Sequence, residues 1–264
     1  MKNESILDHP VEDLDPIVWR KDDSGNHVLT DEAREKISSL VSWACGVLGV
    51  SNAEANITGS ITSNTFTPES DIDVHIHSSE ISEDDAEEKN KSLRKSFEEQ
   101  YKLDNGDRCF IGEHPLEVYF QSNPFQDLMS VGCYSLERGW LVGPELKSMD
   151  YDPYKEYYEE DKKHVESIIG DVRDKILQIY EDAIAYVNSN DEAFKAIDFG
   201  RMAANLHDAS LLFRQAREFR KVYSSPRSEE EALERRESKE WKIADSAFKL
   251  LDKFGYLGIL RTFS

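Results

Sequence analysis

The chain has 264 residues, of which 39% are hydrophobic and 10% aromatic, a globular composition with enough length for one large or two modest domains. Its 53 acidic and 32 basic residues give a formal net charge of −21. This acidity counts against a protein that wraps long duplex nucleic acid, because phosphate binding over a large surface needs a basic footprint.

Cysteine content and hydropathy count against disulfide-rich, zinc-thiolate, exported and membrane-spanning proteins. The scattered cysteines Cys45, Cys109 and Cys133 are too few for a disulfide framework or a four-thiolate zinc site. The first residues do not form an export signal, and no apolar run approaches the length of about 18 residues that a membrane span needs. We therefore expect a soluble, cytoplasmic protein with no membrane partner.

The first half of the chain alternates predicted helices and strands. Thr30 can cap a helix whose apolar residues recur at helical spacing. A short extended stretch at residues 54–58 ends at a Gly-Ser pair, and the strict alternation of residues 71–77 predicts a half-buried strand. Ser82 is expected to cap the next helix, and two short strands are predicted around a turn at residues 112–115.

From about Tyr151 onward, the sequence predicts helices only. Three helical patterns follow one another, and the third is expected to begin at Ser225-Pro226, with the serine as its cap and the proline in its first turn. We therefore expect an α+β fold. A small mixed β-sheet domain with flanking helices would occupy residues 1–150, and an all-helical C-terminal domain would occupy residues 151–264.

Two carboxylates fall on one face of the predicted strand at residues 71–77. Alternation places Asp71 and Asp73 together there, while the apolar residues between and after them face the core. Two carboxylates this close repel each other unless a cation lies between them, and Mg²⁺ is the usual cation for such oxygen ligands. The pair therefore indicates a Mg²⁺ site, with Mn²⁺ as an alternative ion.

A third carboxylate and a Gly-Ser turn extend this candidate site. Alternation in residues 116–120 turns Glu117 to the same face as Tyr119, and a strand beside the first would bring Glu117 close to the two aspartates. Three carboxylates on adjacent strands could hold two metal ions, one activating an attacking hydroxyl and one stabilising a leaving pyrophosphate. Gly59 permits close approach of the backbone, and the hydroxyl and N–H groups from Ser60 onward can hold phosphate oxygens.

This pattern resembles the nucleotidyltransferase superfamily with the DNA-polymerase-beta-like fold. The resemblance rests on a hydrophobic strand that ends in Gly59-Ser60, a spacer of ten residues, and the Asp-hydrophobic-Asp sequence of Asp71 and Asp73. It also includes the later Glu117, which lies within a hydrophobic strand. Together, in this order, these features indicate a nucleotidyltransferase domain.

The resemblance covers about residues 30–122 and implies a role for each matching residue. The Gly-Ser pair would bind the nucleotide phosphates, and the two aspartates would be catalytic residues that hold both Mg²⁺ ions. Glu117 would be the third catalytic metal ligand, next to the acceptor, and would act as the base. The family more often has Asp at this third position, so the longer Glu117 is a departure from its pattern.

The implied reaction is the attack of an acceptor hydroxyl on the α-phosphorus of a nucleoside triphosphate such as ATP. A nucleoside monophosphate is transferred and pyrophosphate is released. The sequence does not identify the acceptor, which could be an RNA end, a protein side chain or a small molecule. A long duplex is not expected. Two other interpretations stay open, a catalytically inactive nucleotide-binding or interaction protein on the same fold, and an acidic surface strand beside a Ser/Thr-rich loop.

Three histidines lie near the candidate site. His75 and His77 are on the strand face of the two aspartates, and His114 is expected in the hairpin turn before Glu117. A zinc hydrolase would use such groups together with the carboxylates. In the other interpretation, which their spacing favours, they line the rim of the cleft or contact nucleotide without binding metal.

A basic stripe is predicted on the helix at residues 191–223. Arg214, Arg217 and Lys221 follow one another at spacings of three and four residues, so one helix face carries all three. They are candidate nucleotide-binding residues, because the forked donors of arginine suit a triphosphate. The other interpretation is a solvent-exposed face paired with neighbouring acidic residues.

Overall fold

The described residues of the computed structural model fall into two compact units. The sheet unit is Asp8–Tyr151 with Pro226–Arg236, and the helical unit takes the other residues. The structure describes residues 10–68, 70–151, 153–188, 190–192, 195, 197, 199–201, 203–205, 207–208, 211, 214, 225–238, 240–242 and 245. Only the backbone is described for residues 105, 107, 108, 153–169 and 172. The domain boundary expected after residue 150 stays a prediction.

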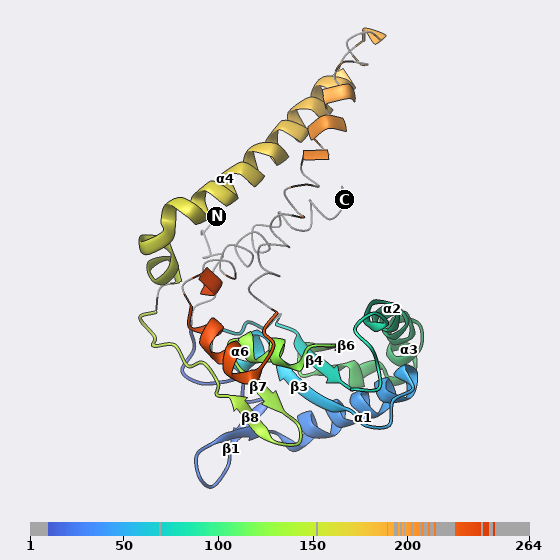
Figure 1. The fold of residues 1–264 in the computed structure, drawn as a ribbon, viewed down its shortest axis with the longest axis vertical. Helices are drawn as coiled ribbons and strands as arrows, with labels where there is room; N and C mark the ends of the chain where they lie inside the picture. Colours follow the sequence, from blue (N-terminus) through green and yellow to red (C-terminus); the bar gives the residue numbers. More distant parts are fainter. Residues whose placement is uncertain are drawn as a thin grey trace. The chain divides into compact units, whose positions relative to one another are not determined.

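A six-stranded sheet forms the centre of the sheet unit (Figure 1). The strands are β3 (Glu54–Thr58), β4 (Ile72–His77), β5 (Phe110–Ile111), β6 (His114–Phe120), β7 (Cys133–Ser135) and β8 (Gly139–Val142). Their order is β5-β6-β4-β3-β7-β8, with β4 and β6 parallel and the other neighbours antiparallel. A separate hairpin joins β1 (Trp19–Lys21) and β2 (His27–Leu29). The mixed sheet confirms the expected fold class.

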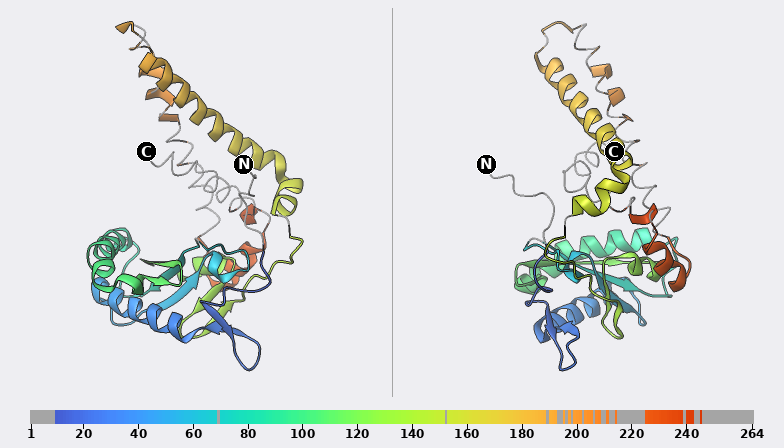
Figure 2. Two further views of the ribbon diagram at one scale, coloured as in Figure 1. Left: turned by 180° about the vertical axis from the view of Figure 1, so that it is seen from behind. Right: turned by 90° about the vertical axis from the view of Figure 1, so that its left-hand side faces the viewer.

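Two helices pack against one face of this sheet (Figure 2). Helix α1 (Asp31–Leu48) is capped as predicted, since the Thr30 hydroxyl accepts a hydrogen bond from Ala33 N at 3.3 Å. Helix α2 (Ala86–Ser96) continues through a π-helical turn, Phe97–Tyr101, into the short helix α3 (Lys102–Asn105).

Apolar side chains of β4 hold the helices on the sheet. Ile72, Val74 and Ile76 are fully buried and belong to one core with residues of α1 and α2. The helical members of this core include Ile37, Leu40, Ala44 and Leu93. Because side chains alternate along a strand, the polar residues of β4 face the opposite side of the sheet. The candidate site is therefore on the face that the two helices leave uncovered.

Two boundaries in the sheet unit differ from the sequence expectation. Helix α2 begins at Ala86 rather than directly after Ser82, because Ser82 caps a separate turn by accepting a hydrogen bond from Asp85 N at 3.2 Å. The hairpin turn is also tighter than expected. Strand β6 begins at His114 and pairs Pro115 with β5, so both residues belong to the strand rather than to the turn.

The helix that was expected to begin at residue 225 begins later. Helix α6 (Glu229–Arg236), which belongs to the sheet unit, starts after Ser228, whose hydroxyl accepts a hydrogen bond from Glu231 N at 3.1 Å. The Glu231 carboxylate in turn accepts one from Arg227 N at 2.7 Å. This reciprocal capping satisfies the N–H groups of Arg227 and Glu231 and determines where the helix begins.

The helical unit contains the long helix α4 (Pro153–Asn188), which confirms the first of the three predicted helical patterns. The described residues from 192 to 214 are helical as well.

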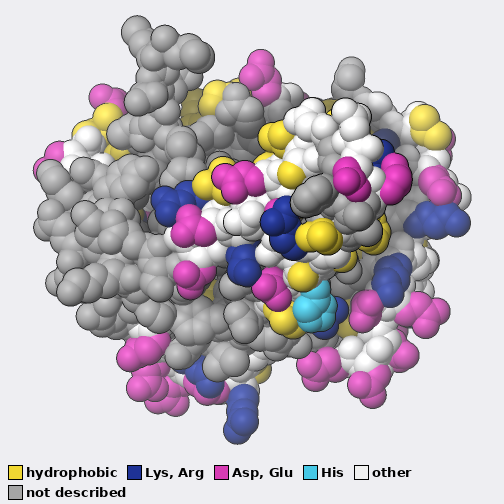
Figure 3. All heavy atoms as spheres, turned by 90° about the horizontal axis from the view of Figure 1, so that it is seen from above, with side chains coloured by type: hydrophobic (Ala, Val, Ile, Leu, Met, Phe, Trp, Pro, Cys, Tyr) yellow, Lys and Arg dark blue, Asp and Glu magenta, His cyan; other side chains and the backbone are white. Residues whose placement is uncertain are grey.

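Charged side chains are common on the surface, as the composition requires. On the face drawn in Figure 3, acidic side chains are spread among lysines and arginines. Among the helices that the structure describes, none has the length and apolar character that crossing a lipid bilayer requires.

Candidate active site

The structure brings the three predicted carboxylates together. Asp73 on β4 lies directly beside Glu117 on the parallel strand β6, and Asp71 lies two residues before Asp73. One carboxylate oxygen from each of the three lies within 4.8 Å of the others. Within the described part of the chain, no other group of three His, Cys, Asp or Glu side chains meets this distance.

The electrostatics of this cluster favour a bound cation. Burial raises the pKa of Asp73 to about 6, and the neighbouring charges of Asp71 and Glu117 add to the shift. Burial, followed by the charge of Asp71, also raises the pKa of Glu117. Closely spaced carboxylate oxygens that repel one another are the donor set that Mg²⁺ and Mn²⁺ prefer. The residues present therefore fit a divalent metal ion.

Gly59 approaches this cluster so closely that a side chain has no room. Its φ is 86°, and a Cβ atom added there would lie 2.7 Å from Asp73 Oδ2. The next residue, Ser60, begins a short 3₁₀ helix, and its hydroxyl donates a hydrogen bond to Ser70 Oγ at 2.8 Å. The Gly-Ser turn therefore lies against the carboxylate cluster, as a phosphate-binding turn would need to.

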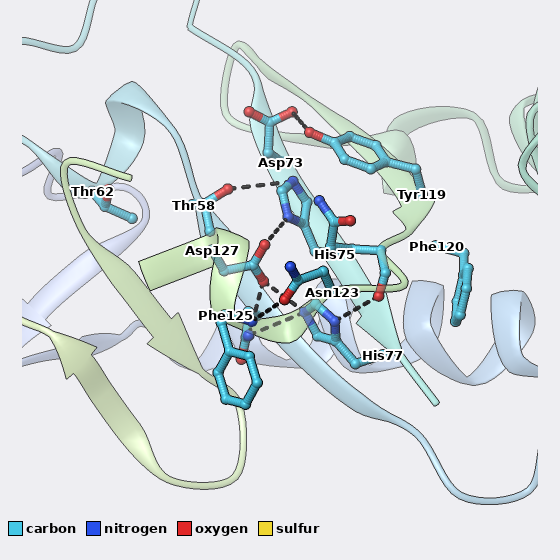
Figure 4. Close-up of polar contacts among 12 residues, drawn as sticks. Thr58, Thr62, Asp73, His75, His77, Tyr119, Phe120, Asn123, Phe125 and Asp127 are labelled. Carbon is cyan, nitrogen blue, oxygen red and sulfur yellow. Dashed lines mark hydrogen bonds and ion pairs between the residues drawn. The ribbon is translucent and has the colours of Figure 1, made fainter. Parts of the chain in front are cut away.

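Tyr119 contacts the cluster from the opposite side. Its hydroxyl donates a hydrogen bond to Asp73 Oδ1 at 3.3 Å, and its ring packs on His75 with centroids 4.2 Å apart (Figure 4). Burial, together with the charge of Asp73, raises the pKa of Tyr119, so its hydroxyl stays protonated at neutral pH. Asp73 Oδ1 therefore accepts a hydrogen bond from Tyr119, and Asp73 Oδ2 faces Gly59.

His75 and His77 do not line the rim of a cleft but point into a buried network around Asp127 (Figure 4). His75 Nδ1 and His77 Nε2 each lie 2.6 Å from an oxygen of Asp127, whose side chain is fully buried. Asn56 Nδ2 donates to Asp127 at 2.9 Å, and His77 Nδ1 donates to Gln121 O at 2.8 Å. The network ties β3 and β4 to the 3₁₀ helix that carries Asp127.

The charges in this network support one another. Burial alone would disfavour a charged ring, but the Asp127 carboxylate outweighs it and raises the pKa of His75. Burial would likewise raise the pKa of Asp127, yet the two histidines outweigh it and hold that pKa well below its usual range. A buried carboxylate between two imidazole rings is thereby stabilised in its charged form.

We expect Asp127→Asn to destabilise the fold by about 3 kcal/mol or more, because it removes the charged partner of two buried histidines. Chemical denaturation gives the free energy of unfolding. Glu54→Gln is the matched control, since its ion pair with Arg138 in the turn between β7 and β8 has both side chains more than half exposed and should be worth under about 1 kcal/mol. Equal effects of the two substitutions would contradict this account of the network.

Comparison with known protein families identifies the domain. Residues 32–109 match the sequence profile of the nucleotidyltransferase domain. This chain contains a nucleotidyltransferase domain. The matched part includes Gly59, Ser60, Asp71 and Asp73 and ends before Glu117. Searches of the curated proteins and of the solved structures found no match.

Sequence reasoning missed one residue of the buried network, Asp127. Asp127 lies beyond the matched residues, and the available signal was an acidic residue within a short apolar stretch after Asn123. His114 was expected in the hairpin turn, but it lies at the start of β6 and is only 2% exposed.

The basic stripe is described in part. Arg214 is helical, and its side chain is exposed. Arg217 and Lys221 lie outside the described residues.

Proposed function

We propose that this protein transfers a nucleoside monophosphate from a nucleoside triphosphate to an acceptor hydroxyl, with release of pyrophosphate. One observation carries the proposal: three carboxylate oxygens, from Asp71, Asp73 and Glu117, lie within 4.8 Å of one another beside the Gly59 turn. The family match supports nucleotidyl transfer as the general activity. The metal dependence and the residue roles are our proposal.

Each side chain of the site would have a defined task. Asp71, Asp73 and Glu117 would hold two Mg²⁺ ions, or Mn²⁺ in their place, and the ions would neutralise charge on the triphosphate. Ser60 and the N–H groups of the Gly-Ser turn would hold phosphate oxygens and orient the α-phosphorus. A Glu117 oxygen would accept the proton of the attacking hydroxyl.

The Ser60→Ala variant should raise the KM for nucleotide and lower kcat/KM by an amount equivalent to about 1 to 3 kcal/mol, the usual value of a hydrogen bond to a charged group. Its hydroxyl donates to Ser70 Oγ at 2.8 Å and would turn to the triphosphate instead. Steady-state kinetics measure the effect. Ser42→Ala, on the exposed face of α1, is the control. Unchanged kinetics in Ser60→Ala would place this hydroxyl in a structural turn only.

Nucleotide contacts by Arg214, Arg217 and Lys221 stay a prediction, as does the cytoplasmic location. ATP is one candidate nucleotide.

The acceptor can be found by incubating the protein with α-labelled nucleoside triphosphates, Mg²⁺ and cell extract, and then separating RNA, protein and small molecules. We expect the label to enter one of these fractions in the presence of Mg²⁺ and to stay in free nucleotide with EDTA. Nucleotide binding without any transfer would instead support the alternative, a catalytically inactive nucleotide-binding protein on this fold.

A further inference from the structure

His114 connects the beginning of the chain to the candidate active site. Its Nε2 lies 2.9 Å from Asp15 Oδ2, and its Nδ1 lies 2.7 Å from Ser70 O. Each ring nitrogen therefore faces a hydrogen-bond acceptor. His114 is 2% exposed and Asp15 is 6% exposed, which shields both bonds from water. Asp15 is itself held in place, because its Oδ1 accepts a hydrogen bond from Ile17 N at 2.7 Å.

The carbonyl that His114 holds belongs to the peptide immediately before Asp71. Strand pairing fixes Asp73 from both sides, opposite Thr58 on β3 and Glu117 on β6. Asp71 lies one residue before the first paired position of β4, which is Ile72. The sheet therefore aligns two of the three carboxylates, and the backbone before the third is held by contacts outside the sheet, from Ser70 N to Thr67 O at 2.9 Å and from His114 to Ser70 O.

We propose that His114, oriented by Asp15, is a positioning residue that fixes the peptide before Asp71 and so sets the position of this carboxylate for metal binding. The inference rests on the proposed function, since it assumes that the carboxylate cluster holds a divalent cation. It also brings Asp15, which lies before the residues matched by the family, into the organisation of the site. If His114 had a purely structural role, loss of either hydrogen bond would lower the stability of the fold and leave the metal affinity unchanged.

A matched pair of substitutions separates the two bonds of His114. An asparagine places its amide nitrogen where Nδ1 lies and can keep the bond to Ser70 O, whereas a glutamine places its amide nitrogen near Nε2 and can keep the bond to Asp15. Each variant loses one buried hydrogen bond, so their melting temperatures should fall by similar amounts. The metal affinity should separate them.

The experiment is a Mn²⁺ titration of the metal-free full chain by electron paramagnetic resonance. We expect His114→Asn to bind Mn²⁺ like the parent and His114→Gln to bind it about ten- to a hundredfold more weakly, as for other groups that orient metal ligands. Equal Mn²⁺ affinities in the two folded variants would overturn the inference. If His114→Gln fails to fold, the double variant His114→Leu with Asp15→Leu takes its place, because it replaces the buried pair by apolar side chains and loses the bond to Ser70 O. Parent-like Mn²⁺ affinity in that variant would overturn the inference as well.

Asp73→Asn in the same titration separates this inference from the proposed function. If Asp73→Asn loses Mn²⁺ binding while the two His114 variants stay equal, only the positioning role is wrong. If Asp73→Asn binds Mn²⁺ like the parent, the metal site itself is wrong and both proposals fall.

Discussion

The Asp73→Asn variant is expected to lose nucleotidyl transfer by about a thousandfold or more, because it removes the carboxylate at the centre of the cluster. Asp73 lies beside Glu117 in the parallel register, faces the Gly59 turn and accepts a hydrogen bond from Tyr119. Single-turnover transfer of label from an α-labelled nucleotide measures the loss. Transfer at the parental rate would contradict a catalytic role for this carboxylate.

The same variant is expected to be more stable than the parent in the absence of metal. The pKa of Asp73 is raised from 3.8 to about 6 in the folded protein, so its ionisation disfavours folding. The contribution of Asp73 to the free energy of unfolding is therefore largest below pH 3.8 and falls by about 3 kcal/mol as the pH rises to about 6. Thermal denaturation in EDTA should show the variant gaining stability over the parent between pH 4 and pH 7. A constant difference across this range would contradict the assignment.

The Gly59→Ala variant is expected to lose about a hundredfold or more in kcat/KM, since the new Cβ would lie 2.7 Å from Asp73 Oδ2 and force this carboxylate aside. A residue other than glycine at φ 86° also costs about 1 to 3 kcal/mol of stability. Kinetics and denaturation measure the two effects separately.

Gly25→Ala is the matched control for that experiment. Gly25 has nearly the same φ, 84°, but a Cβ there would meet nothing within 4 Å. It therefore tests a positive φ without the collision, and should lose stability but keep kcat/KM. Equal losses of activity in the two variants would show that strain alone, and not the contact with Asp73, explains the effect of Gly59→Ala.

Local pattern was enough to predict the centre of the site. Alternation along one strand places Asp71 and Asp73 on a common face, and the same period places Glu117 on a polar face of a second strand. That this second strand lies directly beside the first is a matter of sheet order, which the sequence pattern does not contain. The structure supplies it through the parallel pairing of Asp73 with Glu117.

The supporting contacts could not be predicted, because their partners are distant in sequence. His75 and Asp127 are 52 residues apart, and His114 and Asp15 are 99 residues apart. A histidine on a strand face looks the same in sequence whether it meets solvent, a metal ion or a buried carboxylate. The start of α6 is different, because the Ser228 and Glu231 capping pair is a local signal in the sequence, whereas the helix was expected to begin at the Ser225-Pro226 pair upstream.

The central claim is that Asp71, Asp73 and Glu117 form one divalent-cation site in this nucleotidyltransferase domain. Equilibrium binding of Mn²⁺ to the metal-free chain, compared with Asp71→Asn, Asp73→Asn and Glu117→Gln, tests it most directly. The account predicts saturable binding by the parent and at least about tenfold weaker binding by each of the three variants. Parental affinity in any of the three variants, or no binding by the parent, would contradict it.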